Sequence, residues 1–334
     1  MKLDAQIAPY TSLKVVPEIA RAAERLGFDC LWTAETQHNP FLPGALIAEH
    51  TQRLKFGTAI AVGFARSPGV MAHTAWDLAQ YSEGRFILGL GTQVKAHITR
   101  RFGMPWPDSV TGQLREQILV MRAFWRNWQE GERLSFEGRY YQINLTSPFF
   151  TPAAQDYPEI PVFIAGVNPG LAKLTGELAQ GFHTHPFHTR AYLQDVIVPA
   201  VRLGAEQAGR TLKDIQLVAH AFVVTSPTER ELVRQQLAFY ASTPSYRAVL
   251  EHHGWGQVGE ELSRLARSGK WAEMPDHVSD QLVETFATVA EPADLAAALK
   301  ERYRGIAARI NLYLPFTPGE REDFWRLLCR EFEQ

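Results

Sequence analysis

The sequence has few of the features that mark secreted or membrane proteins. Its two cysteines, Cys30 and Cys329, lie far apart and form neither a disulfide framework nor a metal-type spacing, so we expect buried thiols in a reducing compartment. No stretch approaches the roughly 18 uninterrupted apolar residues of a membrane helix. The first residues, MKLDAQIAPYT, lack the apolar run of a signal peptide. These absences predict a cytoplasmic protein without a membrane partner.

An excess of positive charge is also missing. The chain has 34 Lys and Arg against 36 Asp and Glu, a formal net charge of −2. Because binding to a phosphate backbone needs a dominant basic face, we expect no nucleic-acid partner. The 334 residues, 46% of them hydrophobic, provide ample material for a large core. A barrel of about 250 residues with insertions fits this length.

The stretch Glu83 to Gln93, EGRFILGLGTQ, has two different ends. Its apolar run from Phe86 to Leu90 is typical of a parallel strand buried on both faces. Gly89 and Gly91 then give way to polar residues. Glycine near the end of a strand permits close approach to the backbone, and polar residues beyond buried parallel strands are where α/β enzymes place their chemistry. A Gly-rich strand that ends in an ordinary turn is the alternative.

Strands and helices alternate along the chain, which indicates a parallel sheet with helical crossovers. We predict one (β/α)8 TIM-barrel domain over 1–334, with insertions at roughly 94–160 and 242–290. The alternative fold, a doubly wound open sheet, has less support, because the first turn, APYTSLK, lacks the G-x-G-x-x-G phosphate-binding motif. The predicted strands cover Leu3–Ala8, Phe28–Ala34, Leu54–Val62, the opening stretch, Ile160–Ala165, Gly181–His185, Ile215–Thr225 and Ile310–Leu314.

Three segments carry a resemblance to a known family: FDCLW, the run GTAIAVGFARSPGVMAHTAWDLAQYSEGRFILGLGTQ, and PVFIAGVNPGLAKLTGELAQGF. They resemble the bacterial-luciferase-like superfamily of flavin- and coenzyme F420-dependent oxidoreductases over most of the chain. The segments RRFGMPW and FYASTPSYRAVLEHHGW resemble its F420-dependent branch in particular. The resemblance implies a luciferase-like barrel that binds F420, with FMN as the alternative cofactor.

The resemblance also implies where the cofactor binds. A non-prolyl cis peptide on the third strand, against which the ring packs, falls at Ala59-Ile60, just after Thr58. Backbone amides of Ala165, Gly166, Val167 and Asn168, at the start of a helix, would bind the phosphate. Thr92 and Gln93 follow the fourth strand beside the ring. The charges of Lys95, His97, Arg100 and Arg101 would guide a polyanionic cofactor tail, or form only a solvated face.

Candidate acid/base residues follow the second strand. Relatives place an acidic residue and then a histidine there; here Glu35 is followed by Thr36, and His38 comes two residues later. We predict Glu35 or His38 as the group that exchanges a proton alongside hydride transfer. An anchoring role for Glu35 in its loop is the alternative. Gln93 stands where some F420-dependent dehydrogenases carry a catalytic glutamate, which argues against sugar-phosphate chemistry.

The segment HTHPFH contains His183, His185 and His188. We expect the first two to face opposite sides of a strand, and therefore predict no metal site. Tyr10 and His185 are predicted to line a substrate pocket. The aromatic residues Phe239, Tyr246, Trp255 and Trp271 are interpreted either as a lid or as local core.

The sequence therefore predicts an oxidoreductase that transfers a hydride between F420 and a small organic substrate. Two alternatives stay open: an FMN-dependent luciferase-like monooxygenase that uses oxygen, and a flavin-binding barrel without turnover. A small-molecule substrate is the expected partner, and a homodimer is left open.

Overall fold

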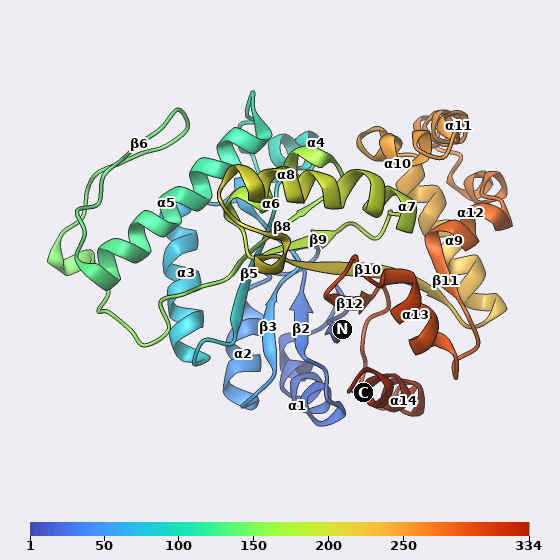
Figure 1. Ribbon diagram of the computed structural model, residues 1–334, viewed down its shortest axis with the longest axis horizontal. Helices are drawn as coiled ribbons and strands as arrows, with labels where there is room; N and C mark the ends of the chain where they lie inside the picture. Colours follow the sequence, from blue (N-terminus) through green and yellow to red (C-terminus); the bar gives the residue numbers. More distant parts are fainter. Residues whose placement is uncertain (334) are drawn as a thin grey trace.

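Eight parallel strands close into a barrel surrounded by helices in the computed structural model, which describes residues 1–333 (Figure 1). Neighbouring strands follow the chain order, and the last pairs with the first, Leu3 opposite Ile310. The predicted (β/α)8 barrel is thus confirmed. In order, the barrel strands are β1 (Lys2–Gln6), β2 (Cys30–Thr33), β3 (Lys55–Thr58), β5 (Phe86–Gly91), β8 (Val162–Gly166), β9 (Gly181–Thr184), β10 (Gln216–Val224) and β12 (Arg309–Leu312).

Helices follow the strands as the apolar periodicity predicts. Helix α1 begins at Val16 and ends at Gly27, which has φ 91° and so suits glycine. Helix α3 has Ser67 as its N-cap, accepting from Val70 N, and Pro68 at its first position. The main helices are α1 (Val16–Leu26), α2 (Leu42–His50), α3 (Pro68–Tyr81), α5 (Val110–Glu130), α6 (Pro169–Leu178), α8 (Val198–Gln207), α9 (Pro227–Ala241), α13 (Leu295–Tyr303) and α14 (Glu322–Glu333).

Two insertions extend from the barrel in opposite directions (Figure 1). The first holds helix α4 (Lys95–Arg100) and a hairpin formed by β6 (Phe136–Glu137) and β7 (Gln142–Ile143). The second is more regular than its sequence suggested: its short helices pack beside α9, and one extra strand pairs with β10. Its elements are η6 (Pro244–Tyr246), α10 (Arg247–Glu251), α11 (Gly256–Arg267), η7 (Trp271–His277), α12 (Asp280–Phe286) and β11 (Ala287–Val289).

A buried ion pair lies inside the barrel near the start of the strands. Arg309 donates through Nε and Nη2 to both oxygens of Asp4, at 2.9 and 2.7 Å, and Trp32 donates its indole N–H to Asp4 at 2.9 Å. Burial raises the pKa of the Asp4 carboxyl, and Arg309 opposes that rise. Asp4, Trp32 and Arg309 are all buried, so this bonded cluster occupies the inside of the barrel near the amino ends of the strands.

Both cysteines are buried free thiols, as expected. Burial raises the pKa of Cys329 to about 12, so this thiol stays protonated. Within residues 1–333, no helix combines the length and the apolar character that crossing a membrane requires.

Candidate active site

A cavity of about 380 Å³ lies at the carboxyl ends of the barrel strands. Side chains from β1, β2, β9 and β10 reach it, as do residues just beyond β3 and β5. This is the face on which barrel enzymes build their sites. Two hollows of similar volume lie elsewhere. One, beside Arg122 and Arg210, borders the amino ends of β8 and β9, and the other, beside Arg25 and Arg326, lies between α1 and α14. The strand-end cavity is therefore the candidate active site.

One wall of the cavity is the segment between β3 and β4 (Ala61–Val62). The peptide bond between Ala59 and Ile60 is cis, at the predicted position, and both residues line the cavity. The backbone around it is bonded to the end of β2. Ala59 N donates to Thr33 O at 2.6 Å, and Glu35 N donates to Ile60 O at 3.0 Å.

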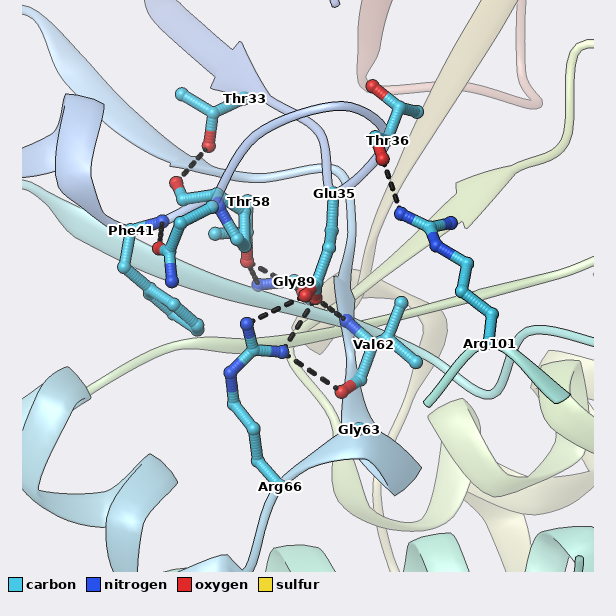
Figure 2. A network of polar contacts seen from close by, with 12 residues as sticks. Thr33, Glu35, Thr36, Phe41, Thr58, Val62, Gly63, Arg66, Gly89 and Arg101 are labelled. Atoms are coloured by element: carbon cyan, nitrogen blue, oxygen red, sulfur yellow. Dashed lines mark hydrogen bonds and ion pairs between the residues drawn. The ribbon is translucent and has the colours of Figure 1, made fainter. Parts of the chain in front are cut away.

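The Glu35 carboxylate is fully occupied by two partners on the same segment. Its oxygens pair with Arg66, Oε2 to Nη1 at 2.6 Å and Oε1 to Nη2 at 2.7 Å, and Oε2 also accepts from Val62 N at 2.7 Å (Figure 2). The Glu35 side chain is only 7% exposed. Bidentate pairs of this kind fix geometry as well as charge. Glu35 thus ties the loop after β2 to the far side of the cis peptide.

Gly89 on β5 allows β3 and β5, the third and fourth barrel strands, to approach each other closely, as predicted for a glycine near the end of this strand. A Cβ on Gly89 would lie 1.7 Å from the carbonyl oxygen of Thr58. The Thr58 hydroxyl forms hydrogen bonds with both backbone polar groups of Gly89: it donates to Gly89 O at 2.6 Å and accepts from Gly89 N at 3.0 Å. A side chain at position 89 would displace Thr58 and the adjoining cis peptide.

Thr92 and Gln93, both predicted to lie beside the cofactor ring, take up different positions beyond β5. Gln93 lines the cavity and adopts a left-handed backbone, φ 58°, while its side-chain oxygen accepts from Val94 N at 3.0 Å. Thr92 is buried, and its hydroxyl donates to Gln93 O at 3.3 Å. The structure therefore places Gln93 in the cavity and Thr92 behind it.

The predicted phosphate-binding segment runs from the cavity to the start of α6. Ala165 lines the main cavity, whereas Gly166 and Val167 line a narrow hollow next to it. Asn168 is exposed at the N-cap of α6 and donates through Nδ2 to Ser245 O at 3.2 Å. The second insertion is thereby attached to the edge of this segment.

Two predicted residues lie outside the cavity. His38 is exposed and borders only a small hollow, with Asn39 and Pro43, which adjoins the cavity and shares Thr33 and Ala34 with it. Tyr10 is 72% exposed, and its neighbour Pro9 lines the cavity instead. The cluster Lys95, His97, Arg100 and Arg101 is exposed on and just after α4, and Arg101 donates to Thr36 O.

Histidines form a buried group at the base of the cavity. His183 and His185 both line it, so the expectation that they face opposite sides was wrong: residues two apart on a strand share a face. His183 Nδ1 lies 3.0 Å from Nε2 of His220, which the sequence reading missed. Burial lowers the pKa of His183 well below its usual value and that of His220 to about 3. Both rings are therefore neutral at physiological pH.

His188 belongs to a separate contact. Its Nε2 lies 3.0 Å from Tyr303 OH and its Nδ1 2.7 Å from His185 O, and burial lowers its pKa to about 4. The described residues contain no group of three or more His, Cys, Asp or Glu side chains placed to hold a metal ion.

Aromatic rings form the opposite wall. The His185 ring lies 4.4 Å from Tyr246 and 4.7 Å from Tyr240, between ring centroids. Tyr240 and Tyr313 line the cavity and share a hydroxyl–hydroxyl hydrogen bond. Phe239 and Trp271 are about half exposed, and Trp255 stacks on His253, so these three do not cover the cavity.

The cavity contains little charge. No Lys or Arg is among the described residues that line it, and its one acid, Glu35, is paired with Arg66. Its polar groups are amides, imidazoles and hydroxyls. This composition suits an uncharged or weakly polar group.

Comparison with known proteins identifies the family. The sequence profile described as "Luciferase-like monooxygenase" matches residues 1–309. The chain belongs to this family. Uncharacterized protein Rv1360 of Mycobacterium tuberculosis is 43% identical, covering 93% of this chain and 92% of that protein. This luciferase-like chain is also 29% identical to the F420-dependent glucose-6-phosphate dehydrogenase of Nakamurella multipartita, over 81% of each.

The luciferase-like barrel is similar in structure to the coenzyme F420-dependent tetrahydromethanopterin reductase from Methanopyrus kandleri. The TM-score is 0.80 at 21% identity, covering 99% of this chain and 97% of the reductase, and at that identity the likeness shows the fold. Family and fold agree: the chain is a member of the luciferase-like monooxygenase family with a parallel eight-stranded barrel.

Proposed function

We propose that this luciferase-like protein is an F420-dependent oxidoreductase that transfers a hydride between the deazaflavin and a small, uncharged organic substrate. The observation that carries the proposal is the cavity at the strand ends, walled by the cis Ala59-Ile60 segment. The named relative from Nakamurella multipartita supports F420 as the cofactor. The aromatic wall and the lack of free charge support an uncharged substrate.

The residues present fit a planar cofactor. Ala59 and Ile60 would support the ring from one side, with Gln93 at its edge. Thr58 is buried and would hold this wall in place through its two bonds to Gly89. Ala165 to Asn168 would bind its phosphate, because the α6 N-terminus presents backbone N–H groups and a positive dipole end. Thr92 would support this arrangement from behind. When bound, the deazaflavin supplies a carbon that accepts or donates the hydride.

The protein's own residues would then hold ring and substrate in contact. Glu35 lines the cavity, but both its oxygens are bonded to Arg66 and one also to Val62 N, so we assign it a positioning role for the wall beneath the ring. His38 lies outside the cavity, and an acid/base role for it would require movement of its loop. His185 and Tyr240 would contact the substrate. Orientation of the two reactants is the main contribution such a site makes to the rate.

Anaerobic turnover tests the proposal. Reduced F420 is mixed with the protein and a panel of small ketones and aldehydes, and the deazaflavin absorbance is followed. We expect reoxidation of F420 that depends on both protein and carbonyl compound. Oxygen consumption with reduced FMN and no reaction with F420 would establish the monooxygenase alternative, which the family description favours. Cofactor binding without turnover in either assay would indicate a binding barrel. A homodimer also stays a prediction.

A further inference from the structure

Four polar side chains form a row across the inside of the barrel, here called the inner polar row: Gln6, Asn311, His220 and His183. They come from β1, β12, β10 and β9, which are neighbours in the sheet. Asn311 Nδ2 donates to Gln6 Oε1 at 2.9 Å and lies 3.0 Å from His220 Nδ1; His220 Nε2 lies 3.0 Å from His183 Nδ1. The row is thus bonded from end to end.

The row ends on an unpartnered nitrogen. His183 Nε2 is buried without a hydrogen-bond partner in the described residues, and His183 is only 1% exposed although it lines the cavity. A Cβ on Gly89 would lie 3.2 Å from this nitrogen, so any side chain at position 89 would crowd it. The ring itself is held by Trp32, edge-on with centroids 4.6 Å apart. An unpaired buried polar atom is costly and calls for an explanation.

The bonds along the row fix which nitrogen carries each proton. The Asn311 amide nitrogen faces Gln6 Oε1 and His220 Nδ1, and in this orientation its two hydrogens go to these two atoms, while Asn311 Oδ1 has no partner among the described residues. His220 Nδ1 then accepts, and the His220 proton is on Nε2. That N–H donates to His183 Nδ1, which leaves the His183 proton on Nε2. Burial lowers the pKa of both rings, and the nearby charge of Arg309 opposes protonation of His183 further. His183 is therefore a neutral ring with Nε2–H free.

We propose that Nε2–H of His183 is a neutral hydrogen-bond donor for a carbonyl oxygen of the ligand bound against Ala59-Ile60, and that Asn311 sets its tautomer through His220. A neutral donor matches an uncharged acceptor in a cavity without free charge. The carbonyl belongs either to the cofactor ring or to the substrate. The ligand part of this inference rests on the proposed function; the tautomer part does not.

Nitrogen NMR of the ligand-free protein tests the tautomer. With 15N-labelled histidine, the His183 and His220 signals are assigned from the spectra of His183→Asn and His220→Asn. We expect both Nε2 atoms to show protonated, pyrrole-type shifts at pH 7, and both Nδ1 atoms to show pyridine-type shifts. The opposite pattern would overturn the donor assignment without touching the proposed cofactor chemistry.

Asn311→Asp should reverse the tautomers of His220 and His183. An ionised carboxylate only accepts, so His220 must place its proton on Nδ1, and His183 Nε2 then becomes a bare acceptor. We expect the NMR pattern to reverse, and either F420 or cyclohexanone added to the F420 complex to bind at least about tenfold more weakly. His183→Gln, which retains a donor group, is expected to lose less affinity than His183→Leu. If Asn311→Asp does not fold, the spectrum of the wild-type protein still tests the tautomer, and the comparison of His183→Gln with His183→Leu still tests the donor.

Ligand titrations identify the carbonyl. A shift of the His183 Nε2 signal with F420 alone assigns the acceptor to the cofactor ring; a shift only when cyclohexanone is added to the F420 complex assigns it to the substrate. An unchanged signal in a fully formed complex with both would overturn the proposal. If F420 does not bind, the proposed function fails, and the donor assignment stands or falls by the ligand-free spectrum.

Discussion

Glu35 and Arg66 form a two-pronged ion pair, at 2.6 and 2.7 Å, that joins the loop after β2 to the turn after β4. The Glu35 side chain is 7% exposed and that of Arg66 18%. The pair spans the cis Ala59-Ile60 segment, and Val62 N adds a third bond to the same carboxylate (Figure 2). Its geometry therefore sets the position of the cavity wall.

Removing this carboxylate should loosen the wall. We expect Glu35→Gln to lower the free energy of unfolding by about 2 kcal/mol, because Arg66 loses its partner in a largely buried place. Cofactor affinity should fall with it. Urea unfolding measures the first effect and fluorescence titration the second. Glu132→Gln is the control, since its pair with Arg126 is half exposed and should contribute under about 1 kcal/mol. Equal effects in the two variants would contradict the positioning role.

Buried neutral histidines should make the fold sensitive to acid. Burial lowers the pKa of His188 to about 4 and that of His220 to about 3, so between these values and about 6.5 the unfolded chain binds more protons than the folded one. Stability should therefore fall as the pH drops below about 6.5, with a slope of about 1.4 kcal/mol per pH unit for each such histidine.

His188→Gln tests that slope. Urea unfolding at pH 7.5, 5.5 and 5.0 should show a shallower loss for the variant than for the wild type, by roughly one histidine's share. His38→Gln, a histidine replacement at an exposed position, is the matched control. Parallel pH profiles for His188→Gln and wild type would refute the assignment.

A phosphorylated substrate should gain nothing from this cavity. Its described lining contains no Lys or Arg, and a phosphate placed there would lose hydration without gaining a counter-charge. We expect glucose 6-phosphate to reduce F420 no faster than glucose does, measured as kcat/KM in the presence of the protein. A clear preference for the phosphorylated sugar would show that a cation reaches the substrate.

The exposed charges beyond β5 should act on the cofactor tail. We expect Arg100→Gln to weaken F420 binding about tenfold while leaving a deazaflavin without the glutamate tail nearly unaffected, with the difference reduced by salt. Arg100 is the cleaner site, because Arg101 also bonds Thr36 O. Arg126→Gln, a charge loss on α5, is the control. Equal loss for both ligands would mean that the cluster is only a solvated face.

The sequence predicted the barrel because each strand is a short apolar run followed by polar residues. An apolar run does not show where a strand is interrupted. The sequence predicts one strand from Leu54 to Val62, whereas the structure has two, β3 and β4, with the cis bond between them. The bond's position came from the family resemblance, since nothing in the local residues requires it.

The short elements of the insertions were missed. Helix α4 spans six residues and buries only Ile98, and the strand β11 spans three. Segments so short have too few periods to reveal an apolar face. Their structure depends on neighbours distant in sequence, as β11 depends on its pairing with β10, and sequence periodicity does not show such neighbours.

The site was predicted in part. Glu35 was identified as a loop residue, but its partner Arg66 lies 31 positions away, and no local pattern links them. The inner polar row was overlooked because His220 and Asn311 are single polar residues inside apolar strands. Their shared inward position on adjacent strands was the available signal, and the mistaken assignment of His183 to the face opposite His185 obscured it.

Cofactor affinity tests the central claim most directly. The purified protein is titrated with F420 and, separately, with FMN, and fluorescence polarisation gives both dissociation constants. We predict that F420 binds at least about tenfold more tightly than FMN, and that Glu35→Gln weakens F420 binding. Tighter binding of FMN, or binding of neither cofactor, would contradict the account of this cavity as an F420 site.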